Sequence, residues 1–108
     1  MKINVEKHLR TMQEIGPMYA AAKANRIYIE ESLRAFKALE MQRSIAQTIS
    51  GKEMDAYASD AYRRALEGLK AAVESEETFR WQLTTASAAV DVWRSQEASN
   101  RALDRGAS

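Results

Sequence analysis

The chain has 108 residues but no cysteine, only one proline and only one histidine. Without cysteine there is no disulfide, thiolate nucleophile or thiolate metal site, and a cytoplasmic protein is the simplest interpretation. A single histidine excludes the helical zinc motif with two histidines and the paired Glu-x-x-His motifs of di-iron bundles. We therefore predict a protein without metal, cofactor or enzymatic activity. His8 is expected to be a surface or helix-packing residue.

Long apolar runs and an excess of charge of one sign are also missing. No apolar stretch approaches the roughly 20 residues that span a bilayer, and the N-terminal segment lacks the form of a signal peptide. Sixteen basic residues stand against fifteen acidic ones, a net charge of +1. Bulk charge therefore argues for neither a membrane nor a nucleic acid as partner, and we expect a soluble protein.

What remains is an alanine-rich, charge-rich composition with 45% hydrophobic and only 7% aromatic residues. This balance is typical of long helices and coiled coils rather than of sheets. From Asp60 to Arg105 there is no proline, and the only glycine is Gly68. As one helix this stretch would be roughly 65 Å long at 1.5 Å per residue. Such a helix needs a partner to cover its apolar side chains, so we predict a single all-α domain over residues 1–108 that forms homo-oligomers.

Glycine and proline positions divide the chain into predicted helices. Glycine commonly follows a helix end and proline is tolerated in the first turn of the next helix, so Gly16-Pro17 predicts a hinge. The prediction is a short helix over residues 1–16, a long helix over 17–50, a connection over 51–59 and a second long helix over 60–105. The two long helices are expected to be antiparallel and coiled-coil-like. Ser59 or Asp60 is expected to cap the last helix.

The last helix carries the apolar line on which oligomerisation is expected to depend. Tyr62, Leu66, Leu69 and Val73 follow at steps of four, three and four, and from Phe79 onward the line resumes one position earlier. A shift of the line is therefore predicted near the acidic segment 74–77. The predicted oligomer interface consists of Leu66, Leu69, Val73, Phe79, Trp81, Leu83, Val90 and Trp93.

Charge is distributed unevenly between the segments. Residues 17–52 contain six basic and three acidic residues, whereas residues 53–79 contain three basic and seven acidic ones. Buried charges need partners, so the acidic segment either faces water or meets the basic stripe of the second helix. That stripe consists of Lys23, Arg26, Arg34 and Lys37, with Glu30 at i,i+4 spacing from Arg26 and Arg34.

The order of these features resembles a known family. A basic helix closing in Ser50-Gly51-Lys52, a polar connection with Tyr57, and a long helix with Leu66, Leu69, Glu77 and Trp81 are similar to the phage recombination mediators of the UvsY type. The resemblance implies a phage protein of the host cytoplasm that forms ring-like oligomers and binds single-stranded DNA. It also implies help in loading a recombinase while a single-strand-binding protein is displaced. The implied DNA contacts are Arg43, Lys52 and Lys37.

Two hypotheses follow for the function. The first is a non-enzymatic accessory protein of homologous recombination that binds single-stranded DNA, where an oligomer multiplies a modest basic patch. The alternative is a helical structural or regulatory module that binds proteins and does not contact nucleic acid. Trp81 is compatible with both hypotheses, because it is predicted to lie either in a contact between protomers or in a ligand surface.

Overall fold

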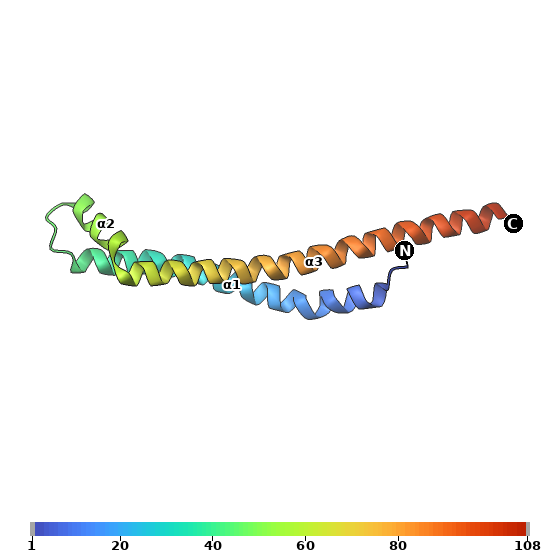
Figure 1. Cartoon of the computed structure of the whole chain (residues 1–108), viewed down its shortest axis with the longest axis horizontal. Coiled ribbons are helices and arrows are strands. Elements are labelled where there is room, and N and C mark those ends of the chain that lie inside the picture. The colour runs from blue at the N-terminus through green and yellow to red at the C-terminus, as the bar shows by residue number, and fades with distance from the viewer. Residues whose placement is uncertain (1, 108) are drawn as a thin grey trace. The chain divides into compact units, whose positions relative to one another are not determined.

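The computed structural model describes residues 2–107, which form three helices and no strand. These are α1 (Val5–Arg43), α2 (Ile49–Ala58) and α3 (Asp60–Ala107) (Figure 1). The all-α prediction is confirmed for the described part of the chain. The helices build two units: residues 2–19 with residues 78–107 form unit 1, and residues 20–77 form unit 2.

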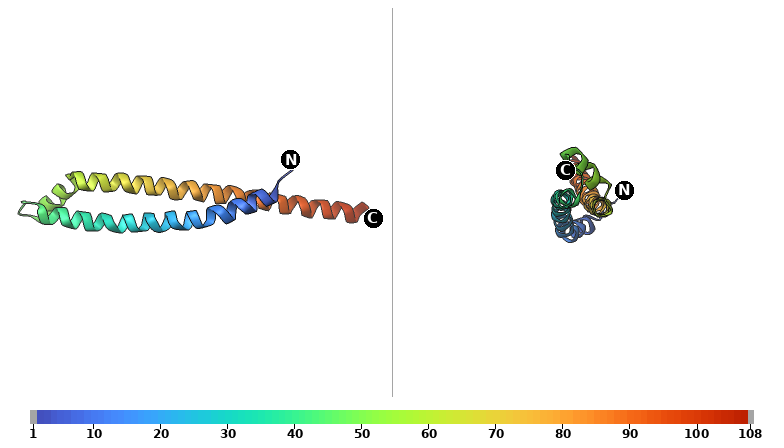
Figure 2. Two further views of the ribbon diagram at one scale, coloured as in Figure 1. Left: turned by 90° about the horizontal axis from the view of Figure 1, so that it is seen from below. Right: turned by 90° about the vertical axis from the view of Figure 1, so that its left-hand side faces the viewer.

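Within each unit, α1 and α3 lie side by side and run in opposite directions (Figures 1 and 2). In unit 2, Arg26 of α1 pairs with Glu76 of α3. In unit 1, Ile15 lines a groove together with Trp81, whereas Ile3 lines another together with Asn100. Residue numbers therefore rise along α1 as they fall along α3, as predicted for the two long helices.

The covered side of α3 follows an unbroken repeat. Buried or half-buried residues recur at alternating steps of three and four, which keeps them on one side of an α-helix. We call this set the contact stripe of α3: Tyr62, Ala65, Leu69, Ala72, Glu76, Phe79, Leu83, Ala86, Val90 and Trp93. The predicted shift of the apolar line near residues 74–77 is wrong, because Ala65 and Ala72 are covered in place of Leu66 and Val73, and the repeat then runs through Glu76 to Phe79 without a break.

The covered side of α1 has the same repeat, and it passes Pro17 without interruption. The contact stripe of α1 consists of Val5, His8, Met12, Ile15, Tyr19, Ala22, Arg26, Ile29 and Leu33, all of them half-buried. Pro17 lies inside α1 and is exposed.

The predicted hinge at Gly16-Pro17, and with it a separate helix over residues 1–16, is wrong. Proline costs a helix interior one backbone hydrogen bond and a steric conflict with the preceding turn. Here the ring points away from the contact stripe, so packing against α3 continues on both sides of it and holds the helix together.

The second helix also ends earlier than predicted, at Arg43 rather than near residue 50. Beyond it, Thr48 caps α2: its backbone is extended, with φ −112° and ψ 155°, and its hydroxyl accepts the Gly51 N–H at 3.0 Å. The predicted connection over residues 51–59 is therefore mostly helix. A hydrogen bond of 2.5 Å from the Ser44 hydroxyl to the Asp55 carboxylate joins the residue after α1 to α2.

Ser59 separates α2 from α3 and caps α3, as one of the two predicted alternatives. Its hydroxyl accepts the Tyr62 N–H at 3.2 Å and donates to the Ala56 carbonyl at 2.7 Å. One side chain thus satisfies an open donor at the start of α3 and an open acceptor at the end of α2. The last helix continues to Ala107, slightly beyond the predicted end at Arg105.

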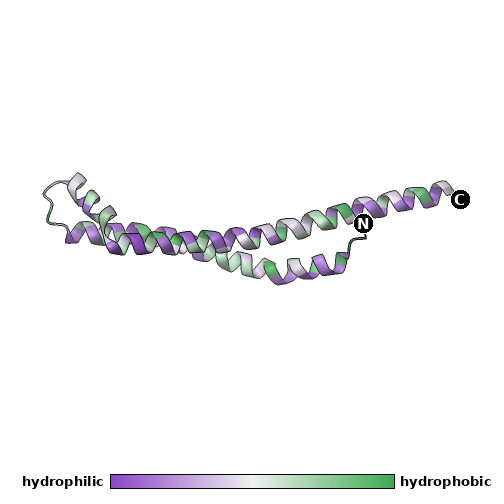
Figure 3. Ribbon diagram, in the orientation of Figure 1, coloured by the Kyte–Doolittle hydropathy of each residue, from purple (hydrophilic) through white to green (hydrophobic). Residues whose placement is uncertain are grey.

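Few side chains are buried. The buried apolar residues of the described chain are Ala56, Ala72, Ala86 and Val90, and α1 has no buried residue. Hydrophobic and hydrophilic residues are interleaved along α1 and α3 (Figure 3). In unit 1, α3 extends past the start of α1, and residues 98–106 are all exposed (Figures 1 and 2).

Candidate interaction surfaces

A partly buried ion pair connects the two long helices in unit 2. Arg26 Nε donates to Glu76 Oε2 at 2.6 Å, and Arg26 Nη2 donates to Glu76 Oε1 at 3.1 Å. Glu76 is only 7% exposed. The third donor, Nη1, reaches Glu30 Oε2 at 3.1 Å, which confirms the predicted i,i+4 partner of Arg26. Arg34, for which the same partner was predicted, instead lies 3.8 Å from Glu31. Two parallel bonds between a guanidinium and a carboxylate form the strongest and most directional class of side-chain hydrogen bond.

The pair also strengthens the preference of Arg26 for its charged form. The hydrogen bonding that Arg26 donates to the Glu76 carboxylate is the main cause that raises the pKa of Arg26 above its ordinary value, against the opposing effect of burial. Of the predicted acidic segment, Glu76 thus meets α1, while Glu74 is exposed. This ion pair is foreshadowed in the sequence, because counting at steps of three and four along each helix places one charged residue, Arg26 or Glu76, among apolar neighbours.

A second cluster binds the end of α1 to α2 and α3. Lys37 Nζ lies 4.8 Å from the centre of the Tyr57 ring and 3.9 Å from Glu53 Oε1. The Tyr57 and Tyr62 rings meet edge to face, with centroids 5.2 Å apart. Tyr57 is the main cause that raises the pKa of Lys37, and Glu53 adds to it. These contacts join α1 to α2 through the Lys37 ammonium group and α2 to α3 through the two tyrosine rings.

The three residues expected to contact DNA all lie in unit 2, but they differ in availability. Lys37 is engaged by Tyr57 and Glu53, so its ammonium already has partners within the chain. The Arg43 side chain is 75% exposed and bonds to Glu40 at 3.1 Å, a pair on the protein surface that contributes little. Lys52 lies in the first turns of α2 and is half-exposed. Arg43 and Lys52 therefore remain the two accessible cations of the predicted set.

The eight residues of the predicted oligomer interface divide into two groups. Five belong to the contact stripe of α3 and are covered within one chain: Leu69, Phe79, Leu83, Val90 and Trp93. The other three lie off the stripe and are 43%, 39% and 62% exposed, in the order Leu66, Val73 and Trp81. Arg80 lies over the Trp81 ring at 5.9 Å. Of these eight residues, only Leu66, Val73 and Trp81 keep substantial exposed surface with which to contact a second molecule.

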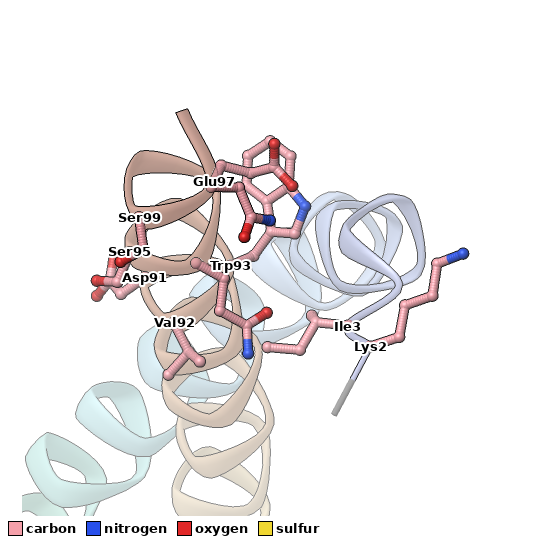
Figure 4. A pocket seen from close by; sticks show the side chains of 10 residues that line it. Lys2, Ile3, Asp91, Val92, Trp93, Ser95, Glu97 and Ser99 are labelled. Carbon is pink, nitrogen blue, oxygen red and sulfur yellow. The ribbon is translucent and has the colours of Figure 1, made fainter. Parts of the chain in front are cut away.

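Unit 1 has open grooves between its two helical segments. One of about 910 Å³ lies beside the last third of α3 and is lined by Trp93 and Glu97 from that helix and by Ile3 from the N-terminal segment (Figure 4). The Lys2 ammonium points away from α3 there (Figure 4). A second, of about 420 Å³, is lined by His8 and Trp81, among others. His8 also belongs to the contact stripe of α1, which places it in helix packing.

Within the part of the chain that the structure describes, no group of three or more histidine, cysteine or acidic side chains is placed to hold a metal ion. In the same residues, no helix is long and apolar enough to cross a membrane. Comparisons with protein-family models, with curated proteins and with solved structures give no match.

Proposed function

We propose that the protein is a helical assembly module that associates with copies of itself through apolar side chains left exposed by its helices. The main observation in support is that the buried apolar residues are small while many large apolar side chains are exposed. No buried apolar residue of the described chain is larger than valine, while large side chains such as Tyr28, Ile45 and Met54 are 72%, 97% and 72% exposed. Exposed apolar surface of this kind marks interaction sites.

The contact stripes support a coiled-coil-like arrangement as the unit of this assembly. Steps of three and four are the spacing of coiled-coil positions, and a polar pair among them is the known device for choosing partner and register. The Arg26–Glu76 pair stands where such a device is expected. Each chain then contributes a preformed helical hairpin to the oligomer.

Sedimentation velocity of the full chain over a range of micromolar concentrations tests the proposal. We expect a species whose mass is a multiple of 12.2 kDa and whose population rises with concentration. Retention of the monomer mass at about 100 μM would exclude the proposal, since interfaces of standard size give tighter binding.

Binding of single-stranded DNA is the second candidate, supported by the exposed side chain of Arg43 in the last turn of α1 and by the partly exposed Lys52 in the first turns of α2. An oligomer would present several copies of this pair and gain affinity through avidity. Help in recombinase loading would follow from such binding. Fluorescence anisotropy with a labelled oligonucleotide should show affinity that falls with added salt and in the Arg43→Ala/Lys52→Ala variant. Absence of binding at low salt would exclude this candidate.

A further inference from the structure

The side of α1 that faces away from α3 in unit 2 has an unusual composition. Its exposed residues at alternating steps of four and three are Ala20, Ala24, Ile27, Glu31, Arg34 and Ala38. We call this set the outer stripe of α1. Ile27 is 45% exposed, and Tyr28, directly beside the stripe, is 72% exposed.

The corresponding outer positions of α3 in the same unit are quite different. They are Arg63, Glu67, Lys70, Glu74 and Glu77, all of them charged. A surface of this kind is stable in water, whereas the outer stripe of α1 repeats the pattern of a covered helix side with no helix over it. Its three alanines and Ile27, beside one acidic and one basic residue, distinguish this stripe from the charged outer side of α3, so its expected occupant is another helix.

We infer that a second copy of the chain packs its own α1 against this stripe, in the antiparallel direction. The inference rests on the self-association proposed above and names its surface. Two charged residues decide the orientation. In a parallel pair, equivalent residues meet, so Glu31 would face Glu31 and Arg34 would face Arg34 of the second copy, with repulsion at both layers.

An antiparallel pair brings residues of different number together. In the register where Glu31 faces Arg34 of the second copy, symmetry repeats the contact, which gives two ion pairs about the two-fold axis. The same register places Ile27 against Ala38, so a large side chain meets a small one. Shifting by one heptad would place Ile27 against Glu31 instead, leaving the charged groups against apolar neighbours.

The Glu31 and Arg34 side chains are available for these contacts. They lie 3.8 Å apart within one chain and are 65% and 83% exposed. An exposed pair at that distance holds its partners weakly, so exchange for contacts between copies costs little. The alanines at positions 24 and 38 add no bulk, which allows two helix backbones to approach closely.

Charge reversal tests the inference. Glu31→Arg and Arg34→Glu, each alone, place only like charges at the axis and should weaken self-association about tenfold or more. A one-to-one mixture of the two variants should associate again, because every contact then joins an arginine to a glutamate. Glu67→Arg on the outer side of α3 is the control and should associate like the unaltered chain. Circular dichroism establishes that all variants keep their helix content.

Cysteine cross-linking tests the orientation, since the chain has no cysteine of its own. Ile27→Cys mixed with Ala38→Cys should form a disulfide between copies on oxidation, while each variant alone should not. Cross-linking of each variant with itself would show a parallel pair and overturn the inference. Unchanged association of both charge variants would overturn it too, while leaving self-association itself intact. A monomeric unaltered chain would instead reject the proposed function.

Discussion

Arg26 and Glu76 lie fifty residues apart in the sequence and join α1 to α3 through two hydrogen bonds of 2.6 and 3.1 Å. Each is the charged member of an otherwise mainly apolar contact stripe. A slip of either helix by one heptad would leave both charges facing apolar side chains, at the cost of their desolvation. The pair therefore selects one register out of several that the apolar residues alone would accept.

The first prediction concerns the contribution of this pair to stability. Glu76→Gln removes the negative charge and one of the two oxygens that accept from Arg26, and should lower the free energy of unfolding by about 1–3 kcal/mol. Urea unfolding followed by circular dichroism measures the change. Glu67→Gln, at an exposed position of the same helix, is the matched control and should stay within about 0.5 kcal/mol of the unaltered chain.

Replacing both Arg26 and Glu76 tests whether the ion pair is needed for stability, apart from its effect on helix register. Arg26→Met/Glu76→Leu exchanges the pair for apolar side chains of similar size, and its stability should equal or exceed that of the unaltered chain. Equal stability of Glu76→Gln and the unaltered chain would contradict a role of the pair in the fold.

The second prediction is a pH dependence that arises from Lys37. Contacts with Tyr57 and Glu53 raise the pKa of Lys37 above its ordinary 10.5, so the folded chain holds the proton more tightly than the unfolded chain. The charged Lys37 side chain then makes its full contribution to the free energy of unfolding below about pH 10. This contribution is lost as the pH rises through the pKa of Lys37 in the folded chain. Thermal unfolding of the unaltered chain and of Lys37→Met, compared from pH 7 to pH 11, measures this.

We expect a constant difference in melting temperature between these two proteins up to about pH 10, followed by a decrease. Lys23→Met, at an exposed position of the same helix, serves as control and should show no such decrease. A difference that persists unchanged at pH 11 would mean that Lys37 acts through its methylene groups rather than its charge.

The third prediction concerns Pro17. Its ring lies in the interior of α1 and is exposed, so Pro17→Ala removes a local penalty without disturbing the contact stripe. The variant should be more stable by about 1–3 kcal/mol, measured by urea unfolding. A loss of stability would indicate that the proline has a packing role. Gly16→Ala is a useful comparison, since a Cβ there meets nothing within 4 Å and about 1 kcal/mol of gain is expected.

Helix type and approximate length were predictable because they depend on local properties. Alanine-rich composition, the absence of proline beyond position 17 and apolar steps of three and four are properties of neighbouring residues, and a helix forms from bonds between residues four apart. The boundaries were less predictable. Gly16-Pro17 is a local stop signal that packing on both sides overrides, and Thr48 starts a short helix where a connection was expected.

In the candidate surfaces, too, features set by local sequence were predictable and features set by tertiary packing were not. Exposure of Arg43 and Trp81 agrees with positions away from the contact stripes, which periodicity indicates. The engagement of Lys37 by Tyr57 does not follow from periodicity, since it requires α2 to fold back onto the end of α1. Glu76 was recognisable as a charge on the apolar line, but its partner was only one of four candidates in the basic stripe.

By itself, then, the sequence determined an all-helical chain with two long amphipathic helices and no thiol chemistry. Only the tertiary structure decided that α1 continues through Pro17, that Arg26 is the residue facing Glu76, and that the outer stripe of α1 is left uncovered. The physical reason is that helix formation depends on bonds within one segment. The register between segments depends on which side chains meet across fifty residues of chain, where many alignments share the same apolar repeat.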